Sequence, residues 1–101
     1  MLSFEHETDN GALLIALKGE LDARTARDFE SALMPLLEDV KSVTFDFENL
    51  EYISSAGLRV MLLAEQTLEK KGAEMVKIVN MSSMIRELFE ITGFGDILAI
   101  E

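Results

Sequence analysis

The start of the chain carries the hydrophobic pattern of a β-hairpin. Residues 2–7 alternate apolar side chains with polar ones, as a half-buried strand does. Asn10-Gly11 follows, and this dipeptide favours a two-residue hairpin turn because both residues tolerate positive φ. Residues 12–17 are apolar on both faces, which is typical of a strand inside a sheet.

The next periodic segment predicts a helix. Thr25 and Asp28 have the spacing of a capping box, in which side chains accept hydrogen bonds at the start of the helix. Pro35 lacks the N–H that would bond to Ser31, so we expect a kink there. Five apolar residues keep helical spacing along this segment: Phe29, Leu33, Leu36, Leu37 and Val40.

Two further helices and three further strands follow. Three short segments are rich in apolar or β-branched side chains, so each predicts a strand: residues 43–47, 74–79 and 97–100. Apolar residues at helical spacing predict one helix between residues 55 and 72 and another between 82 and 93. Residues that favour helix ends mark their limits: Gly72, Ser82 or Ser83, and Gly93.

This order, a hairpin followed by three helix–strand pairs, defines the fold class. Each β-α-β crossover makes the strands that it joins parallel, with a right-handed connection. We therefore predict one α/β domain over residues 1–101, with a mixed sheet of about five strands and three main helices. The sheet should have a parallel core and an antiparallel N-terminal strand, because a hairpin ties that strand to its neighbour.

The predicted topology brings two distant loops together. In parallel α/β sheets, binding sites gather beyond the carboxyl ends of the strands. Residues 18–24 and residues 48–55 both open at that edge. Asp22 and Ser55 should therefore lie on one surface, although they are far apart in the sequence.

The charge balance limits the kinds of partner. The chain has 9 basic and 19 acidic residues and a net charge of −10. This argues against nucleic acid and anionic membranes, which need a basic surface. It mildly favours a basic protein partner, although solubility alone explains it as simply. We see no signal peptide and no apolar run of the roughly 20 residues that span a bilayer, and expect a cytoplasmic location.

The residues that could carry chemistry do not form a recognisable catalytic set. The chain has no cysteine, and its one histidine, His6, lies on a strand predicted to be half-buried, where a structural role is usual. The serine turn lacks the Gly-x-Ser-x-Gly spacing, since residue 53 is isoleucine. No P-loop or metal-binding loop occurs. We predict no catalytic residue, metal or cofactor, and keep a small hydrolase as a remote alternative.

Ser54 and Ser55 lie where a predicted strand turns into a helix. The first N–H groups of a helix have no internal partner, and the helix dipole adds partial positive charge there. A hydroxyl at this point can cap the helix and stabilise it by about 1 kcal/mol. The same place suits a phosphate carried on that hydroxyl. A cap and a phosphorylation switch are therefore both open interpretations.

Three segments carry a family resemblance. They are Tyr52-Ile53-Ser54-Ser55-Ala56-Gly57-Leu58, Gly19-Glu20-Leu21-Asp22 and the stretch from Arg86 to Phe94. Together they resemble the STAS-domain anti-sigma-factor antagonists of bacteria, along the whole chain and in the right order. The resemblance implies a binding protein whose partner is a serine kinase that doubles as an anti-sigma factor. In that family, the unmodified antagonist binds the kinase and frees the sigma factor, phosphorylation of one serine releases it, and a serine phosphatase resets the switch.

The resemblance identifies Ser55 as the phosphorylated residue. The family usually has Asp-Ser-Ser/Thr-Gly-Leu at this site, and the serine after the aspartate is modified. Counting back from Gly57 puts the aspartate at Ser54 and the second hydroxyl at Ala56. Ser54 is therefore a conceivable second acceptor. Asp22 matches the acidic residue that the family has on the neighbouring loop.

A set of partner-binding residues follows from the resemblance and from helical spacing. Arg59 lies one turn beyond Ser55, where it could hold a phosphate, contact a partner or be a solvated helix residue, and a further turn leads to Leu63. An alternative function is a STAS-fold module that binds a small ligand or joins a larger complex without phosphorylation. The oligomeric state stays open. The predicted partner-binding residues are Glu20, Asp22, Ser54, Ser55, Ala56, Gly57, Arg59 and Leu63.

Overall fold

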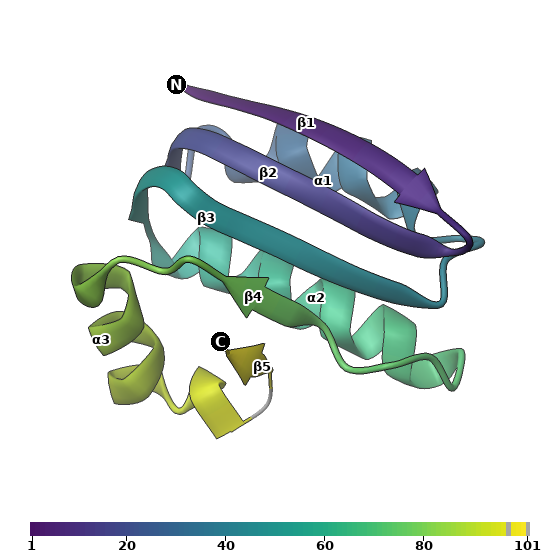
Figure 1. Cartoon of the computed structure of the whole chain (residues 1–101). Coiled ribbons are helices and arrows are strands. Elements are labelled where there is room, and N and C mark those ends of the chain that lie inside the picture. Colours follow the sequence, from purple (N-terminus) through teal and green to yellow (C-terminus); the bar gives the residue numbers. More distant parts are fainter. Residues whose placement is uncertain (97, 101) are drawn as a thin grey trace.

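One mixed sheet runs through the molecule, with its strands in the order β1-β2-β3-β4-β5 (Figure 1). The computed structural model describes residues 1–96 and 98–100. β1 and β2 form an antiparallel hairpin, and the later strands run parallel to β2, which confirms the predicted mixed α/β sheet. The strands are β1 (Leu2–Asp9), β2 (Ala12–Leu21), β3 (Ser42–Ile53), β4 (Lys77–Val79) and β5 (Ala99–Ile100).

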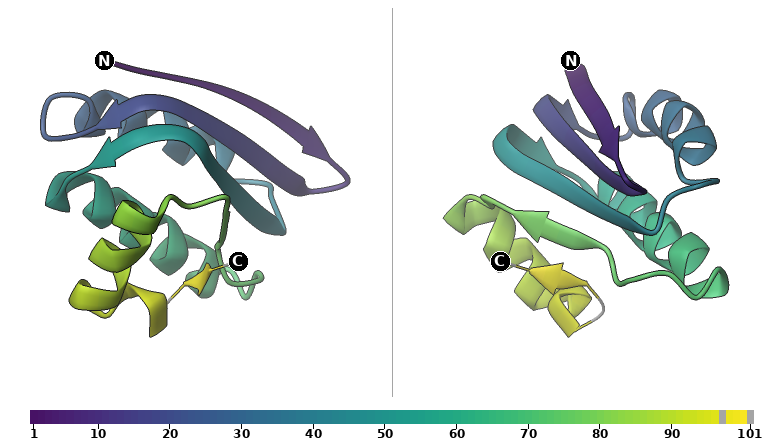
Figure 2. Two further views of the ribbon diagram at one scale, coloured as in Figure 1. Left: turned by 60° about the vertical axis from the view of Figure 1, so that its left-hand side comes forward. Right: turned by 45° about the vertical axis from the view of Figure 1, so that its right-hand side comes forward.

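Three α-helices connect the strands, as predicted. They are α1 (Ala26–Leu36), α2 (Ser55–Lys70) and α3 (Ser83–Thr92), and a short 3-10 helix, η1 (Phe94–Asp96), follows α3. α1 and α2 lie on the same side of the sheet, behind it in Figure 1 and beside it in Figure 2. The opposite face of the sheet, which faces the viewer in Figure 1, is called the open face below.

Several predicted turns and caps are confirmed. Asn10 and Gly11 have φ values of 52° and 85°, as a two-residue hairpin turn requires. Ser82 caps α3, since its hydroxyl accepts a hydrogen bond from the Ile85 N–H at 3.2 Å. Gly93 ends the same helix with a φ of 79°, a left-handed conformation that favours glycine.

The capping box at Thr25 was a wrong prediction. The backbone of Thr25 is already helical, with φ −101° and ψ −20°, whereas a capping side chain needs an extended backbone. Its hydroxyl instead donates to the Glu20 carbonyl oxygen and accepts from the Asp22 N–H, both at 2.9 Å. Thr25 therefore joins the end of β2 to the start of α1.

The first helix is also shorter than predicted. α1 ends at Leu36, one residue after Pro35, so the proline lies in the last turn. Leu37 is buried but lies beyond the helix. The Lys71 ammonium donates to the carbonyl oxygens of Leu37 and Glu38 and so caps the chain where the helical bonds stop.

β4 begins three residues later than predicted. Glu65 of α2 is 7% exposed, and its carboxylate accepts a hydrogen bond from the Val76 N–H at 2.8 Å. This bond holds the Val76 backbone against α2, and regular strand pairing starts at Lys77. The last strand is Ala99–Ile100, and Ile97, which was predicted to begin it, lies outside the described residues.

The core fills the space between the sheet and the helices. Two groups of phenylalanine rings packed edge to face link the elements: Phe4, Phe29 and Phe45, and then Phe47, Phe89 and Phe94. Residues 12–17 lie inside the sheet as predicted, since β2 is between β1 and β3, although Leu14 on the open face is 37% exposed. His6 was predicted to be half-buried but is exposed, since it lies on the edge strand β1.

Candidate protein-interaction site

The two predicted loops were drawn too long, because β2 continues to Leu21 and β3 to Ile53. The ends of these two strands lie side by side. Glu20 pairs with Tyr52 and Leu21 with Ile53 in the parallel register of these strands. The Ser54 N–H then donates to the Leu21 carbonyl oxygen at 3.0 Å. The acidic loop after β2 and the serine turn after β3 therefore form one surface, which we call the strand-end surface.

Gly57 allows the first turn of α2 to approach the end of β2. A Cβ atom on Gly57 would lie 2.8 Å from the Leu21 carbonyl oxygen and 2.7 Å from Cγ1 of Ile53. Real Cβ atoms do not approach other atoms so closely, and part of this contact is backbone. A residue without a side chain is therefore needed for the serine turn to sit against the acidic loop.

The two serines have different environments. Ser54 is the residue before α2, with an extended backbone, but its hydroxyl makes no capping bond. The Ser54 Oγ is buried and has no hydrogen-bond partner among the described residues. Ser55 is the first residue of α2 and is exposed. The interpretation of the Ser54 side chain as a helix cap was wrong, because its oxygen is turned into the protein.

The start of α2 is an electrostatically open helix end. The first turn contains no acidic residue, so no carboxylate of its own compensates the positive end of the helix dipole. The backbone N–H groups of the first turn have no partner inside the helix. Negative charge placed at Ser55 would therefore be locally favourable.

Two acidic residues, Asp22 in the loop and Glu20 at the end of β2, are held in fixed positions. The Asp22 carboxylate accepts hydrogen bonds from the N–H groups of Arg24 at 2.9 Å and Thr25 at 3.2 Å. The bond from Arg24 lowers the pKa of Asp22 below its ordinary 3.8, and the Thr25 N–H and hydroxyl act in the same direction. Glu20 forms an ion pair with the N-terminal ammonium of Met1 at 3.0 Å. The loop therefore holds the Asp22 carboxylate in a fixed position on the strand-end surface.

Arg59 and Leu63 lie farther along α2. Arg59 forms an ion pair with Glu30 of α1 at 3.5 Å, and its side chain stays 68% exposed. Leu63 is half-buried, and lies about 12 Å along the helix axis from Ser55. Ala56 is also half-buried. Gly57 is buried beneath the serine turn. The strand-end surface therefore contains the predicted residues up to Ala56, with Arg59 at its border and Leu63 outside it.

Tyr52 belongs to the same surface but was not among the predicted partner-binding residues. Its side chain is 46% exposed, and its backbone pairs with Glu20 at the end of the sheet. Strand alternation next to the buried Ile53 is a sequence signal that could have placed it outward. An exposed tyrosine is a common anchor in protein interfaces because it buries a large area with one polar tip.

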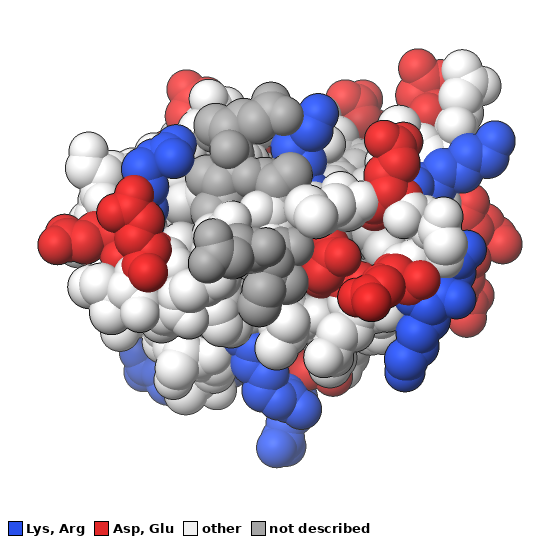
Figure 3. All heavy atoms as spheres, turned by 90° about the horizontal axis from the view of Figure 1, so that it is seen from below, with Lys and Arg blue, Asp and Glu red and all other residues white. Residues whose placement is uncertain are grey.

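Other kinds of site find little support in the described part of the chain. No group of three or more histidine, cysteine, aspartate or glutamate side chains there could hold a metal ion. No helix among these residues is long and apolar enough to cross a membrane. Seen from below, basic groups alternate with acidic and uncharged ones, so this view shows no continuous basic surface for nucleic acid (Figure 3).

The mixed α/β fold described above belongs to a known domain family. The model of the STAS domain family matches residues 3–101, and the chain belongs to this family. The chain is similar to BtrV of Bordetella bronchiseptica, which is described as a candidate anti-sigma factor antagonist. The two are 35% identical over 92 residues, which cover 90% of this chain and 78% of BtrV.

One further relative and one solved structure are also similar to the chain. The anti-sigma-B factor antagonist of Staphylococcus aureus is 30% identical over 100 residues, which cover 98% of this chain and 92% of that protein. SpoIIAA of Bacillus, whose structure is known in a phosphorylated form, superimposes with a TM-score of 0.76 at 22% identity. That match covers 98% of this chain and 91% of SpoIIAA, and it shows the common fold.

Proposed function

We propose that this chain is an anti-sigma-factor antagonist of the STAS type, which acts in the cytoplasm. In its unphosphorylated form it binds an anti-sigma factor that is also a serine kinase, and so frees the sigma factor. Phosphorylation of Ser55 ends this binding, and a serine phosphatase restores it. The observation that carries the proposal is the exposed Ser55 at the open start of α2, beside the fixed carboxylate of Asp22.

The environments of the two serines support Ser55 as the acceptor. A kinase must reach the hydroxyl oxygen of its substrate, and the Ser55 residue is exposed. The Ser54 Oγ is buried, so its phosphorylation would require local opening of the serine turn. The names of the relatives BtrV and the Staphylococcus aureus antagonist, and the phosphorylated form of SpoIIAA, support the same class of function.

The charge of a phosphate explains how the switch would work. Phosphorylation adds a charge of about −1.5 to −2 at neutral pH. At Ser55 this charge meets the positive end of α2, so the helix should keep its structure. Release of the partner then comes from repulsion and steric clash at the strand-end surface, where Asp22 and Glu20 already carry negative charge.

Phosphorylation with a purified kinase tests the proposal. The serine kinase encoded nearest to this gene is incubated with ATP and the protein, and the site is located by tandem mass spectrometry. We expect one phosphate, at Ser55. Ser54→Ala should still be phosphorylated, whereas Ser55→Ala should not. A phosphate found on Ser54, or none on either serine with an active kinase, would contradict the proposed switch.

Binding measurements separate the switch from the interaction itself. By isothermal titration, Ser55→Asp should bind the same kinase at least about tenfold more weakly, a loss of about 1.4 kcal/mol. Ser55→Ala and Ser54→Ala are the matched controls and should bind like the wild type. If Ser55→Asp binds the kinase as tightly as the wild type does, the proposed switch is wrong. If no form of the protein binds the kinase, this kinase is not the partner.

A further inference from the structure

β1 is a regular, uncovered edge of the sheet. No strand pairs with it on the side away from β2, and no described segment lies beyond it (Figures 1 and 2). Its eight residues pair with β2 without a register shift from Leu2 to Asp9, and none of them is proline. Edge strands are usually blunted by proline, bulges, a covering segment or charged side chains, and β1 has only the last of these.

The hairpin register determines which backbone groups of β1 remain open. A two-residue turn makes Asp9 and Ala12 a hydrogen-bonded pair, and such pairs alternate along an antiparallel ladder. The bond from the Glu20 N–H to the Met1 carbonyl oxygen, at 3.0 Å, continues this alternation at the other end. The N–H and carbonyl groups of Phe4, His6 and Thr8 therefore point away from β2, toward the free edge.

The open face beside this edge is acidic around an apolar floor. Glu5 pairs with Ala16 and Glu7 with Leu14, so neither carboxylate faces a cation on β2. Both are exposed, and no ion pair or hydrogen bond joins either side chain to another described residue. A hollow of about 190 Å³ lies here, lined by Glu5, His6, Glu7, Leu14 and Ala16.

A second copy of the chain fits this edge poorly. Antiparallel pairing of two β1 strands about a two-fold axis keeps the same face outward in both copies. If Phe4 of one copy pairs with His6 of the other, Glu5 faces Glu5. If His6 pairs with His6, Glu5 faces Glu7. Like charges directly opposite each other destabilise a strand pair. The charges that oppose self-pairing are complementary to a basic strand.

We propose that the free edge of β1 binds an extended segment of a partner protein that has lysine or arginine at alternate positions. The backbone of this segment would hydrogen-bond to Phe4, His6 and Thr8, adding a strand to the sheet. Its basic side chains would lie on the open face, directly beside Glu5 and Glu7 of β1, and would pair with these carboxylates across the two strands. This site is separate from the strand-end surface and does not depend on Ser55.

A peptide pair tests the proposal. One fluorescent peptide has lysine at every second position with threonine and valine between, and the other has the same composition with the lysines in one block. By anisotropy at about 0.15 M salt, where long-range attraction is screened, the alternating peptide should bind at least about fivefold more tightly. N-methylation of every second peptide bond on the edge that faces β1 should abolish this preference. Equal binding of the two peptides would overturn the proposal.

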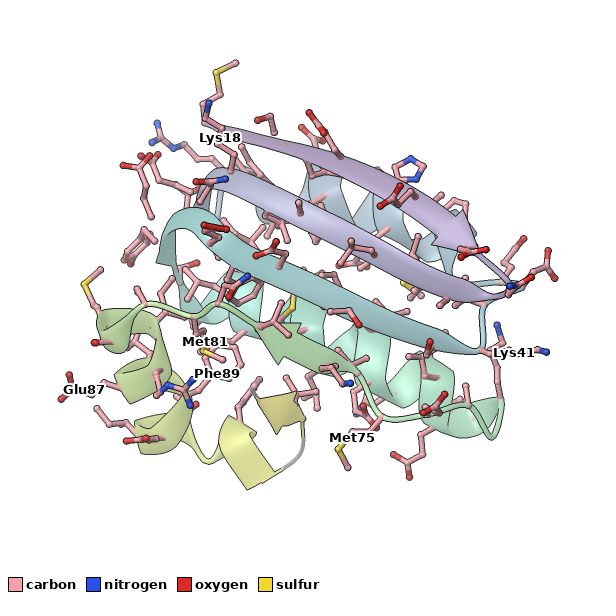
Figure 4. All side chains as sticks on the ribbon, viewed as in Figure 1. Lys18, Lys41, Met75, Met81, Glu87 and Phe89 are labelled. Atoms are coloured by element: carbon pink, nitrogen blue, oxygen red, sulfur yellow. The ribbon has the colours of Figure 1, made fainter. Side chains whose placement is uncertain are left out.

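Matched variants locate the site on the protein. The double variant Glu5→Gln, Glu7→Gln should bind the alternating peptide at least about fivefold more weakly than the wild type does. The control double variant Glu69→Gln, Glu87→Gln makes the same change in net charge elsewhere on the protein. Glu69 and Glu87 are exposed, and Glu87 points away from the sheet on α3 (Figure 4). The second pair should change binding by less than about twofold. Equal losses from the two pairs would show attraction by net charge alone and contradict the site.

Hydrogen exchange tests the backbone part of the inference. In the complex, the amides of Phe4, His6 and Thr8 should exchange at least about tenfold more slowly than in the free protein. Protection confined to other strands, or sedimentation as a dimer that the peptide dissociates, would overturn the proposal in favour of another site or of a second copy. Ser55→Asp should leave the peptide affinity unchanged, which distinguishes this surface from the proposed switch.

Discussion

Asp22, which the sequence predicts to be a partner-binding residue, also has a structural role. Its carboxylate accepts hydrogen bonds from two backbone N–H groups at the turn into α1, and the Thr25 N–H is shared with the Asp22 carbonyl oxygen. The Ser54 hydroxyl shows the opposite case, because it stands at the expected position but makes no bond among the described residues. At the scale of single residues, sequence position and side-chain environment are therefore separate facts.

The lowered pKa of Asp22 predicts a contribution to stability that acid removes. Its folded pKa lies below the unfolded value of 3.8, so the contribution is complete above 3.8 and is lost as the pH falls through the folded pKa. NMR titration of the side-chain carboxyl should give a midpoint below 3.8. In Asp22→Asn, which keeps the acceptor oxygen but not the charge, the free energy of unfolding should fall less steeply over this range. A midpoint at or above the ordinary value would contradict this prediction.

Among the contacts between elements, the close approach of α2 to the end of β2 is the one that positions the serine turn. Gly57 lets the helix start against Leu21, and the Ser54 N–H continues the β2–β3 ladder by bonding to the same carbonyl group. Farther along α2, Glu65 accepts a hydrogen bond from the Val76 N–H. Lys71, just after α2, donates to the Leu37 carbonyl oxygen at the end of α1. The serine turn is thus positioned by contacts between elements and not by its own sequence alone.

Gly57→Ala tests this contact. The added methyl group would meet Ile53 and the Leu21 backbone, so we expect a loss of about 2–3 kcal/mol in the free energy of unfolding. Urea denaturation followed by circular dichroism measures it. Gly72→Asn is the control, because Gly72 has open space around it and asparagine tolerates its φ of 72°. That variant should lose about 0.5 kcal/mol or less. Similar losses in both would mean that close approach is not the reason for Gly57.

The whole molecule has one covered and one open sheet face. α1 and α2 cover the face of Leu13, which is 2% exposed, whereas its neighbour Leu14 on the open face is 37% exposed. The sheet is also asymmetric at its edges, since β1 is long and free while β5 has two residues. The open face and the free edge together make the second interaction surface proposed above.

The two adjacent leucines of β2 provide a test of this arrangement. Leu13→Ala should lower the free energy of unfolding by about 2–5 kcal/mol, because it leaves a cavity in the core. Leu14→Ala should lower it by less than about 1 kcal/mol, because that side chain keeps contact with water. Both are measured by urea denaturation under the same conditions. Equal losses would mean that the open face is covered in solution.

The predictions that succeeded rest on local chemistry. The hairpin at Asn10-Gly11, the cap at Ser82 and the end of α3 at Gly93 depend on backbone preferences of a few adjacent residues. The predictions that failed depend on distant partners. Thr25 turned to Glu20, and Val76 was held by Glu65, so neither followed the pattern of its neighbours.

The sequence by itself determined the order of the elements, the parallel direction of the later strands and the strand-to-helix turn at Ser54 and Ser55. It could do so because period, turn chemistry and crossover handedness are properties of short segments. Only the tertiary structure decided which serine faces solvent, which face of β2 is covered and which edge of the sheet stays free. These depend on where α1 and α2 pack, and packing is a property of the whole chain.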